Sequence, residues 1–158
     1  MKNKIEIIAE IAQGFEGNEK LTNLLTKGAI ASNADAVKFQ LVYGDELATP
    51  DYDYYQLFKD LEMDKSIWIN ACNQIHNSGK RVYFDVFGLT SLNLAKELGA
   101  DGVKISTTEF YNNALFDHAI EQFDKLFLSV GGIPVDDIDK KLSALSKEQA
   151  DKICLMYG

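Results

Sequence analysis

The sequence is poor in cysteine. Its two cysteines, Cys72 and Cys154, lie far apart and lack the CxxC spacing of redox and metal sites. Two such residues do not form the framework of a disulfide-rich secreted domain. Cys72 falls in a helical pattern and Cys154 in a short apolar run, so we expect free and mostly buried thiols.

Long apolar runs are also missing. No stretch approaches the roughly 20 apolar residues that a membrane-spanning helix needs. The apolar residues near the start of the chain are interrupted by Glu6 and Glu10, a pattern too broken for a signal peptide. We therefore predict a cytoplasmic protein with no membrane partner.

Basic residues are outnumbered by acidic ones. The chain has 16 Lys and Arg against 24 Asp and Glu, a net charge of −8. Binding to nucleic-acid phosphates needs a basic face, which this composition does not readily form, so we expect no nucleic-acid partner. A small anionic ligand would have to be held by a few local residues.

Proline occurs only twice, and no Gly/Ser-rich stretch or run of like charge marks a linker. A chain of 158 residues, 46% of them hydrophobic, is long enough for one core. We predict a single domain over residues 1–158.

Histidine is equally scarce. His76 and His118 both fall in helical patterns, without a second ligand at metal-binding spacing. Neither follows a strand, which argues against a Ser-His-Asp or Cys-His arrangement. Gly14-x-x-Gly17 lacks the remaining features of a nucleotide-binding loop. The sequence therefore predicts no metal site and no nucleotide site.

The sequence does contain short apolar runs that alternate with amphipathic segments, the pattern of an α/β fold. Strands rich in apolar residues on both faces, separated by helices, indicate a parallel sheet buried on both sides. A doubly wound sheet and a barrel both fit this order, with about six βα units. The predicted strands are 5–11, 36–42, 82–87, 102–106, 126–130 and 153–157. The predicted helices are 20–32, 65–77, 91–98, 114–122 and 135–145.

The connection 43–63 is longer than ordinary loops. It fits either a lid over a ligand or a short helix at 54–58 packed on the rim, and the helix is the interpretation we prefer.

Polar residues finish several of the apolar runs. Ligands of parallel α/β folds lie at the carboxyl ends of the strands, so these residues are the candidate site. They are Glu10, Gln13, Lys38, Gln40, Lys104, Ser106 and Ser129.

Two of these residues are lysines inside apolar strands, Lys38 in Val-Lys-Phe-Gln and Lys104 in Val-Lys-Ile-Ser. A lysine is too costly to bury without a negative partner. Glu10 and Glu109 could supply that charge as structural ion pairs, and so could a phosphate or carboxylate ligand. Because the feature occurs twice, we favour the ligand.

Four segments in this order resemble the sialic acid synthase family: Ile-Ile-Ala-Glu-Ile-Ala-Gln-Gly-Phe-Glu-Gly (7–17), Ala-Asp-Ala-Val-Lys-Phe-Gln (34–40), Val-Lys-Ile-Ser-Thr-Thr-Glu (103–109) and Phe-Leu-Ser-Val-Gly-Gly (127–132). The resemblance covers essentially the whole chain. It implies the barrel, and we predict an incomplete (β/α)8 TIM-barrel-type fold with about six βα units. It implies condensation of phosphoenolpyruvate with an N-acetylated sugar aldehyde such as N-acetylmannosamine, which releases phosphate and forms a nine-carbon 2-keto acid. It also implies a divalent metal, Mn or Mg.

By the same resemblance, Lys38 and Lys104 would bind the phosphate and carboxylate of phosphoenolpyruvate, helped by Thr107 and Ser129. The remaining matched positions, Glu10, Gln40 and Glu109, would contact the amino sugar, and either Glu10 or Glu109 would handle a proton.

The chain departs from the family in two places. Where the family usually has Gly-x-Asn-His, this chain has Ala12-Gln13-Gly14-Phe15. Where the family usually has Ser-Thr-Pro-Phe, it has Asp85-Val86-Phe87-Gly88. These departures leave open another phosphoenolpyruvate-using or aldolase-type barrel with a different acceptor.

The family's metal-binding histidines come from later strands, and its C-terminal antifreeze-like domain follows them. We therefore expect residues 1–158 to be the N-terminal part of a synthase barrel, without the metal ligands and inactive alone. The remaining alternative is a non-catalytic barrel fragment. An open parallel sheet has edges that pair with other strands, so we expect a homo-oligomer in either case.

Overall fold

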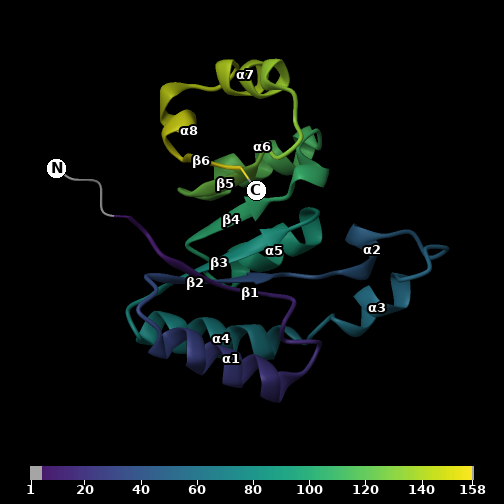
Figure 1. Ribbon diagram of the computed structural model, residues 1–158, viewed down its shortest axis with the longest axis vertical. Coiled ribbons are helices and arrows are strands. Elements are labelled where there is room, and N and C mark those ends of the chain that lie inside the picture. Colours follow the sequence, from purple (N-terminus) through teal and green to yellow (C-terminus); the bar gives the residue numbers. More distant parts are fainter. Residues whose placement is uncertain (1–4, 158) are drawn as a thin grey trace.

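A computed structural model describes residues 5–157 of the chain. Six parallel strands form one sheet in the order β1-β2-β3-β4-β5-β6 (Figure 1). Each strand lies next to the strand that follows it in the sequence, whereas a doubly wound sheet reverses direction at a switch point. The prediction of a (β/α)8-type fold with six βα units is confirmed. The strands are β1 (Ile8–Ala12), β2 (Ala36–Gln40), β3 (Arg81–Val86), β4 (Gly102–Ile105), β5 (Leu126–Ser129) and β6 (Ile153–Met156).

Helices alternate with the strands along the chain. All five predicted helices are present within two residues at each end. The connection after β2 holds two short helices, which confirms the helical interpretation of its second half. The helices are α1 (Glu19–Ala31), α2 (Gly44–Leu47), α3 (Tyr55–Asp60), α4 (Lys65–Asn77), α5 (Leu89–Glu97), α6 (Asn113–Gln122), α7 (Val135–Ser143) and α8 (Lys147–Asp151), with a 3-10 turn η1 (Thr107–Glu109). None of the helices described is long and apolar enough to cross a membrane.

The main core lies between the sheet and its helices. Trp68 of α4 is 2% exposed and packs edge-on against Phe39 of β2 and Phe84 of β3, with ring centroids 5.5 and 5.6 Å apart. Such edge-to-face pairs add roughly 0.5–1.5 kcal/mol each beyond burial of their area. These contacts hold α4 against one face of the sheet, beside α1 (Figure 1).

The other face of the sheet carries a small apolar cluster made of Ile8, Ala36, Tyr83 and Phe127. Tyr83 and Phe127 pack edge-to-face at 5.0 Å. Lys38 and Asp85 lie two residues after Ala36 and Tyr83, so they project from this same face, closer to the carboxyl ends. The apolar cluster is therefore the floor beneath the predicted site.

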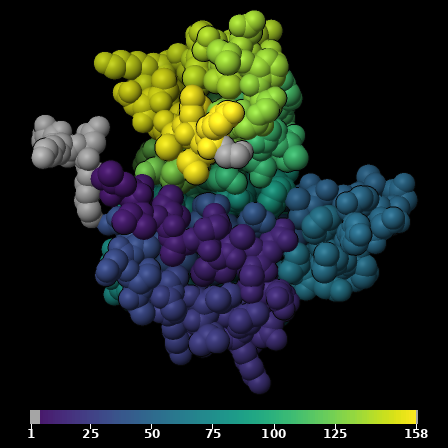
Figure 2. Space-filling model, in the orientation of Figure 1, coloured from purple at the N-terminus to yellow at the C-terminus, as the bar shows by residue number. Residues whose placement is uncertain are grey.

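The connection between β2 and α4 projects from the rest of the molecule, as the blue lobe in Figure 2 shows. Within it, Tyr52 stacks on Phe58 with their ring centroids 6.4 Å apart. Gly44 and Tyr55 begin its two short helices, α2 and α3.

One expectation about the cysteines is wrong. Cys72 is buried in α4, but Cys154 is exposed on β6. In the part of the chain that the structure describes, β6 pairs only with β5, so its side chains lack the neighbours that an inner strand has. The apolar run predicted as a strand does form β6, but the exposure of its side chains is set by its place at the edge of the described sheet.

Candidate functional site

Four charged side chains from four adjacent strands meet at the carboxyl end of the sheet: Glu10, Lys38, Asp85 and Lys104. Strand register brings them together, because Glu10 pairs with Lys38 across β1 and β2, and Asp85 pairs with Lys104 across β3 and β4. We call these four residues the charged cluster.

Asp85 is the centre of the charged cluster. Its Oδ1 accepts a hydrogen bond from Lys38 Nζ at 2.6 Å, and its Oδ2 accepts one from Lys104 Nζ at 2.7 Å. Lys38 also forms an ion pair with Glu10. The sequence offers Glu10 and Glu109 as ion-pair partners of the lysines, as the alternative to the ligand that we favour. Glu10 has that role, and Asp85 replaces Glu109.

Burial differs across the charged cluster. The side chains of Asp85 and Lys38 are 1% and 6% exposed, whereas those of Lys104 and Glu10 are 18% and 46% exposed. A lysine ammonium has three N–H donors. Lys38 directs two of them to carboxylates and Lys104 directs one, so three donors remain for a ligand. The more exposed members, Glu10 and Lys104, thus lie on the outer two of the four strands, with the buried pair between them.

A bulge at the end of β1 positions Glu10. The pairing with β2 slips between Glu10 and Ala12, and Ala12 has a positive φ of 52°. That backbone region is uncommon for a residue with a Cβ and marks local strain. The backbone N–H of Ala12 donates to Glu10 Oε1 at 2.9 Å. The bulge therefore turns the backbone back onto the carboxylate and leaves the other Glu10 oxygen for Lys38.

The floor beneath the charged cluster is closed by a second ionic group, centred on Glu6. The hydroxyl of Tyr83 donates to Glu6 Oε1 at 2.6 Å, Arg81 lies 2.6 Å from the same oxygen, and Lys125 pairs with Oε2. Burial alone would raise the pKa of Glu6, but the hydrogen bonds from Lys125 and Tyr83 and the nearby charges outweigh it, and the pKa lies below its usual 4.5. Burial, followed by the hydrogen bond to Glu6, raises the pKa of the Tyr83 hydroxyl.

The other predicted site residues lie at the same carboxyl ends. Gln40 and Ser129 are the last residues of β2 and β5, Thr107 begins η1 after β4, and all three are partly exposed. Glu109 turns toward the start of α6, where its Oε2 accepts a hydrogen bond from Asn112 Nδ2 at 3.0 Å.

Glu46 of α2 connects the long loop to the next βα unit. Its carboxylate accepts hydrogen bonds from the backbone N–H groups of Thr90 at 2.6 Å and Ser91 at 3.2 Å, at the N-terminus of α5. A Cβ on Gly88 would lie 2.5 Å from Glu46 Oε1, so the approach depends on the glycine. The contact fixes the rim of the site beside Asp85. The sequence pattern did not single out Glu46, because its partners are 44 and 45 residues away.

Metal binding does not fit the described residues. Residues 5–157 contain no group of three or more His, Cys, Asp and Glu side chains that could hold a metal ion. His76 pairs with Asp101 at 2.9 Å, and His118 Nδ1 lies 2.8 Å from the carbonyl oxygen of Ala114 in its own helix. Neither histidine belongs to the charged cluster.

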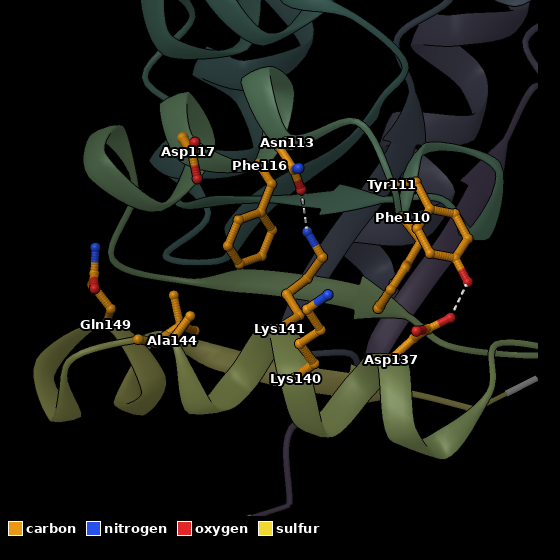
Figure 3. A pocket seen from close by; sticks show the side chains of 11 residues that line it. Phe110, Tyr111, Asn113, Phe116, Asp117, Asp137, Lys140, Lys141, Ala144 and Gln149 are labelled. Atoms are coloured by element: carbon orange, nitrogen blue, oxygen red, sulfur yellow. Dashed lines mark hydrogen bonds between the residues drawn. The ribbon is translucent and has the colours of Figure 1, made fainter.

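A cavity of about 460 Å³ lies outside the sheet, between α6 and α7 (Figure 3). Lys141 crosses it with its ammonium 4.3 Å from the centre of the Phe116 ring, and donates to Asn113 Oδ1 at 2.9 Å. Burial lowers the pKa of Lys141. None of the charged cluster lines this cavity. The contacts of Lys141 attach α7 to α6, which is a structural role.

A known family model matches most of the chain. The family model described as the NeuB family matches residues 25–158. An uncharacterized protein of Methanocaldococcus jannaschii is 22% identical over 151 residues, which are 96% of this chain and 45% of that protein.

Solved structures share the fold. An N-acetylneuraminic acid (sialic acid) synthetase of Leptospira borgpetersenii, in complex with citrate, matches 99% of this chain and 57% of its own with a TM-score of 0.86 and 21% identity. The spore coat polysaccharide biosynthesis protein SpsE of Bacillus subtilis matches 99% and 44%, with a TM-score of 0.81 and 21% identity. A phospho-2-dehydro-3-deoxyheptonate aldolase of Thermotoga maritima matches 97% and 42%, at 0.64 and 13%. The chain thus spans about half the length of these proteins.

Proposed function

The chain belongs to the NeuB family, and from this membership and the charged cluster we propose that it forms the phosphoenolpyruvate-binding part of a sugar-acid synthase. The proposed reaction condenses phosphoenolpyruvate with an N-acetylated sugar aldehyde of the N-acetylmannosamine type. The C3 carbon of phosphoenolpyruvate bonds to the aldehyde carbon, water adds at C2, and phosphate leaves, which gives a sialic-acid-like 2-keto acid. The enzyme would be a C–C bond-forming transferase.

The observation that carries this proposal is the pair of lysines that flank β3. Lys38 and Lys104 project from the strands on either side of Asp85, and three of their N–H donors remain for a ligand. Phosphoenolpyruvate carries a phosphate and a carboxylate, and both are natural partners of lysine ammonium groups. The Leptospira synthetase, which shares this fold, was solved with citrate, another small polyanion.

The other residues at the carboxyl ends complete the proposal. Thr107 and Ser129 are hydroxyl donors for the phosphate or carboxylate, and Gln40 is an amide for the amino sugar. Glu10 is the stronger candidate for proton transfer at the sugar aldehyde, because it belongs to the charged cluster and is 46% exposed. Glu109 instead accepts a hydrogen bond from Asn112 and would contact the sugar from the rim.

A divalent metal, Mn or Mg, remains an expectation for full-length members of the family. The described residues supply no site for it, and none of the roles above uses one. We expect the chain alone to bind phosphoenolpyruvate without turning it over, since it spans between 42% and 57% of the structures reported above.

A second candidate is an aldolase-type barrel that uses a different acceptor. It is favoured by the similarity to the Thermotoga aldolase and by Asp85, whose charge differs from the serine expected there. A third candidate is a barrel fragment that associates with itself. Strands β1 and β6 each have one partner in the described sheet, so their other edges can pair with a second copy.

Titration calorimetry with phosphoenolpyruvate tests the proposal. We expect Lys104→Ala to weaken binding at least tenfold, and Lys27→Ala, an exposed lysine on α1, to bind as the wild type does. Lys104 is the better target because Asp85 keeps Lys38 as a partner in the variant. Equal affinities of the wild type and Lys104→Ala would refute the assignment.

Addition of acceptors separates the first two candidates. An N-acetyl amino sugar that binds beside phosphoenolpyruvate should lower the apparent Kd of phosphoenolpyruvate, whereas aldoses without the N-acetyl group should not. If aldoses without the N-acetyl group lowered the apparent Kd and the N-acetyl amino sugar did not, the result would favour the aldolase-type barrel. In the same samples, phosphate release above background with manganese would contradict the expectation that the chain alone is inactive.

A further inference from the structure

We propose that Asp85 is an internal competitor for the anion site: its carboxylate occupies the position between Lys38 and Lys104 that a ligand's phosphate or carboxylate would take, and so it weakens the binding of small anions. This inference rests on the proposed function of the two lysines. It assigns to Asp85 a role in setting ligand affinity.

The geometry of Asp85 matches that of a bound anion. Its two oxygens accept from two different lysines, at 2.6 and 2.7 Å, which are ordinary lengths for charge-assisted hydrogen bonds. Asp85 lies on β3, between the strands that carry the lysines, and pairs in register with Lys104. Adjacent strands lie about 4.8 Å apart, so the lysines reach toward each other across β3 and a single carboxylate can bridge them.

The charges of the cluster lead to the same conclusion. Glu10 and Asp85 balance Lys38 and Lys104, so the cluster has no net positive charge. A ligand anion must approach a carboxylate that is 1% exposed and already bound to both lysines. Replacement of Asp85 by a neutral residue would leave one positive charge in excess and free at least one lysine N–H donor.

Competition by Asp85 would also affect the release of product in the proposed reaction. That reaction releases inorganic phosphate, an anion that offers the lysines terminal phosphate oxygens like those of the substrate. As phosphate leaves, the Asp85 carboxylate can form its two hydrogen bonds again, whereas a site with a neutral residue would leave the lysines to retain the product.

Titration calorimetry of inorganic phosphate and of phosphoenolpyruvate against the wild type and Asp85→Asn tests the inference. Asparagine keeps the shape of aspartate and removes its charge. We expect Asp85→Asn to bind both anions at least tenfold more tightly than the wild type. Asp124→Asn makes the same change of net charge at a fully exposed carboxylate before β5, and it should leave both affinities unchanged.

The outcomes separate the two proposals. If the wild type binds phosphoenolpyruvate through Lys104 and Asp85→Asn binds it equally or more weakly, the competitor role is wrong and the proposed function stands. If neither protein binds either anion, both proposals are wrong.

A thermal melt shows whether each variant is folded. Asp85→Ser is tested in the same way as a second neutral replacement. Where a neutral variant is unfolded alone, the inference requires inorganic phosphate to restore its cooperative melt, because phosphate then takes the place of the carboxylate between the lysines. A variant that stays unfolded with phosphate would contradict the inference.

Discussion

Lys104 Nζ donates a hydrogen bond to Asp85 Oδ2 at 2.7 Å, from the strand that pairs in register with β3. The contact joins one of two predicted ligand-binding lysines to a carboxylate that the sequence pattern did not assign to the site. The same carboxylate binds Lys38, so stability and the proposed ligand binding involve the same three side chains.

The two lysines should differ in their effect on stability. Lys38→Met leaves the buried Asp85 with Lys104 alone and leaves Glu10 with the Ala12 N–H but no cationic partner. We expect it to lower the free energy of unfolding by about 3–5 kcal/mol. Lys104→Met removes one charged hydrogen bond at a more exposed side chain, with an expected loss of about 1.5–3 kcal/mol. Urea denaturation measures both. A larger loss for Lys104→Met would mean that burial does not determine which of the two lysines contributes more to stability.

Glu6 should make the fold sensitive to acid. Its pKa in the folded chain lies below the usual 4.5, so its stabilising contribution is complete above about pH 4.5 and is lost as the pH falls through the folded pKa. Glu6→Gln should therefore lower stability at pH 7 and flatten the decline of stability below pH 4.5. Urea unfolding between pH 3 and 7 measures this, with the exposed Glu121→Gln as control. An unchanged acid decline in Glu6→Gln would be inconsistent with the ionic group at the floor.

The two cysteines should react at very different rates. Burial raises the pKa of the Cys72 thiol to about 12, whereas Cys154 is exposed on β6. An aromatic disulfide reagent at pH 8 should titrate one thiol rapidly in the native protein and two in urea. Cys154→Ser should abolish the rapid phase and Cys72→Ser should keep it. Rapid labelling in Cys154→Ser would show that Cys72 is accessible.

The contact between Gly88 and Glu46 should appear as coupling in a double-mutant cycle. Gly88→Ala places a Cβ where Glu46 Oε1 lies, so Glu46 must give up its hydrogen bonds to the start of α5. We expect a loss of about 1 kcal/mol, the usual value of a helix N-terminal cap. In the Glu46→Ala background the same change should cost less. If the losses of stability from Gly88→Ala and Glu46→Ala were additive, the effect of Gly88→Ala would not arise from its contact with Glu46.

Sheet edges should drive association of the chain. Leu155 and Met156 on β6 are 44% and 38% exposed, on a strand with one partner in the described sheet. We expect the apparent mass in size-exclusion chromatography with light scattering to rise with concentration, and Leu155→Lys to reduce that rise. Leu24→Lys, at an exposed position on α1, is the matched control. A monomer at all concentrations would refute the expectation of a homo-oligomer.

The sequence alone determined the elements and the class of fold. Apolar periodicity is a local property, so the strands around Lys38 and Lys104 and the helix around Trp68 could be read without knowledge of their neighbours. The position of Glu10, Lys38, Lys104 and Ser129 at strand ends follows from the same local pattern, because parallel strands share one carboxyl edge.

Only the tertiary structure decided which residues meet. Asp85 became the centre of the charged cluster because strand register places it between two lysines 47 residues before it and 19 residues after it. Cys154 is exposed because its strand lies at the edge of the described sheet, and Glu46 caps α5 because the long connection folds back onto it. A local pattern specifies which face of a strand is apolar, but contacts between distant segments depend on how the strands align with one another.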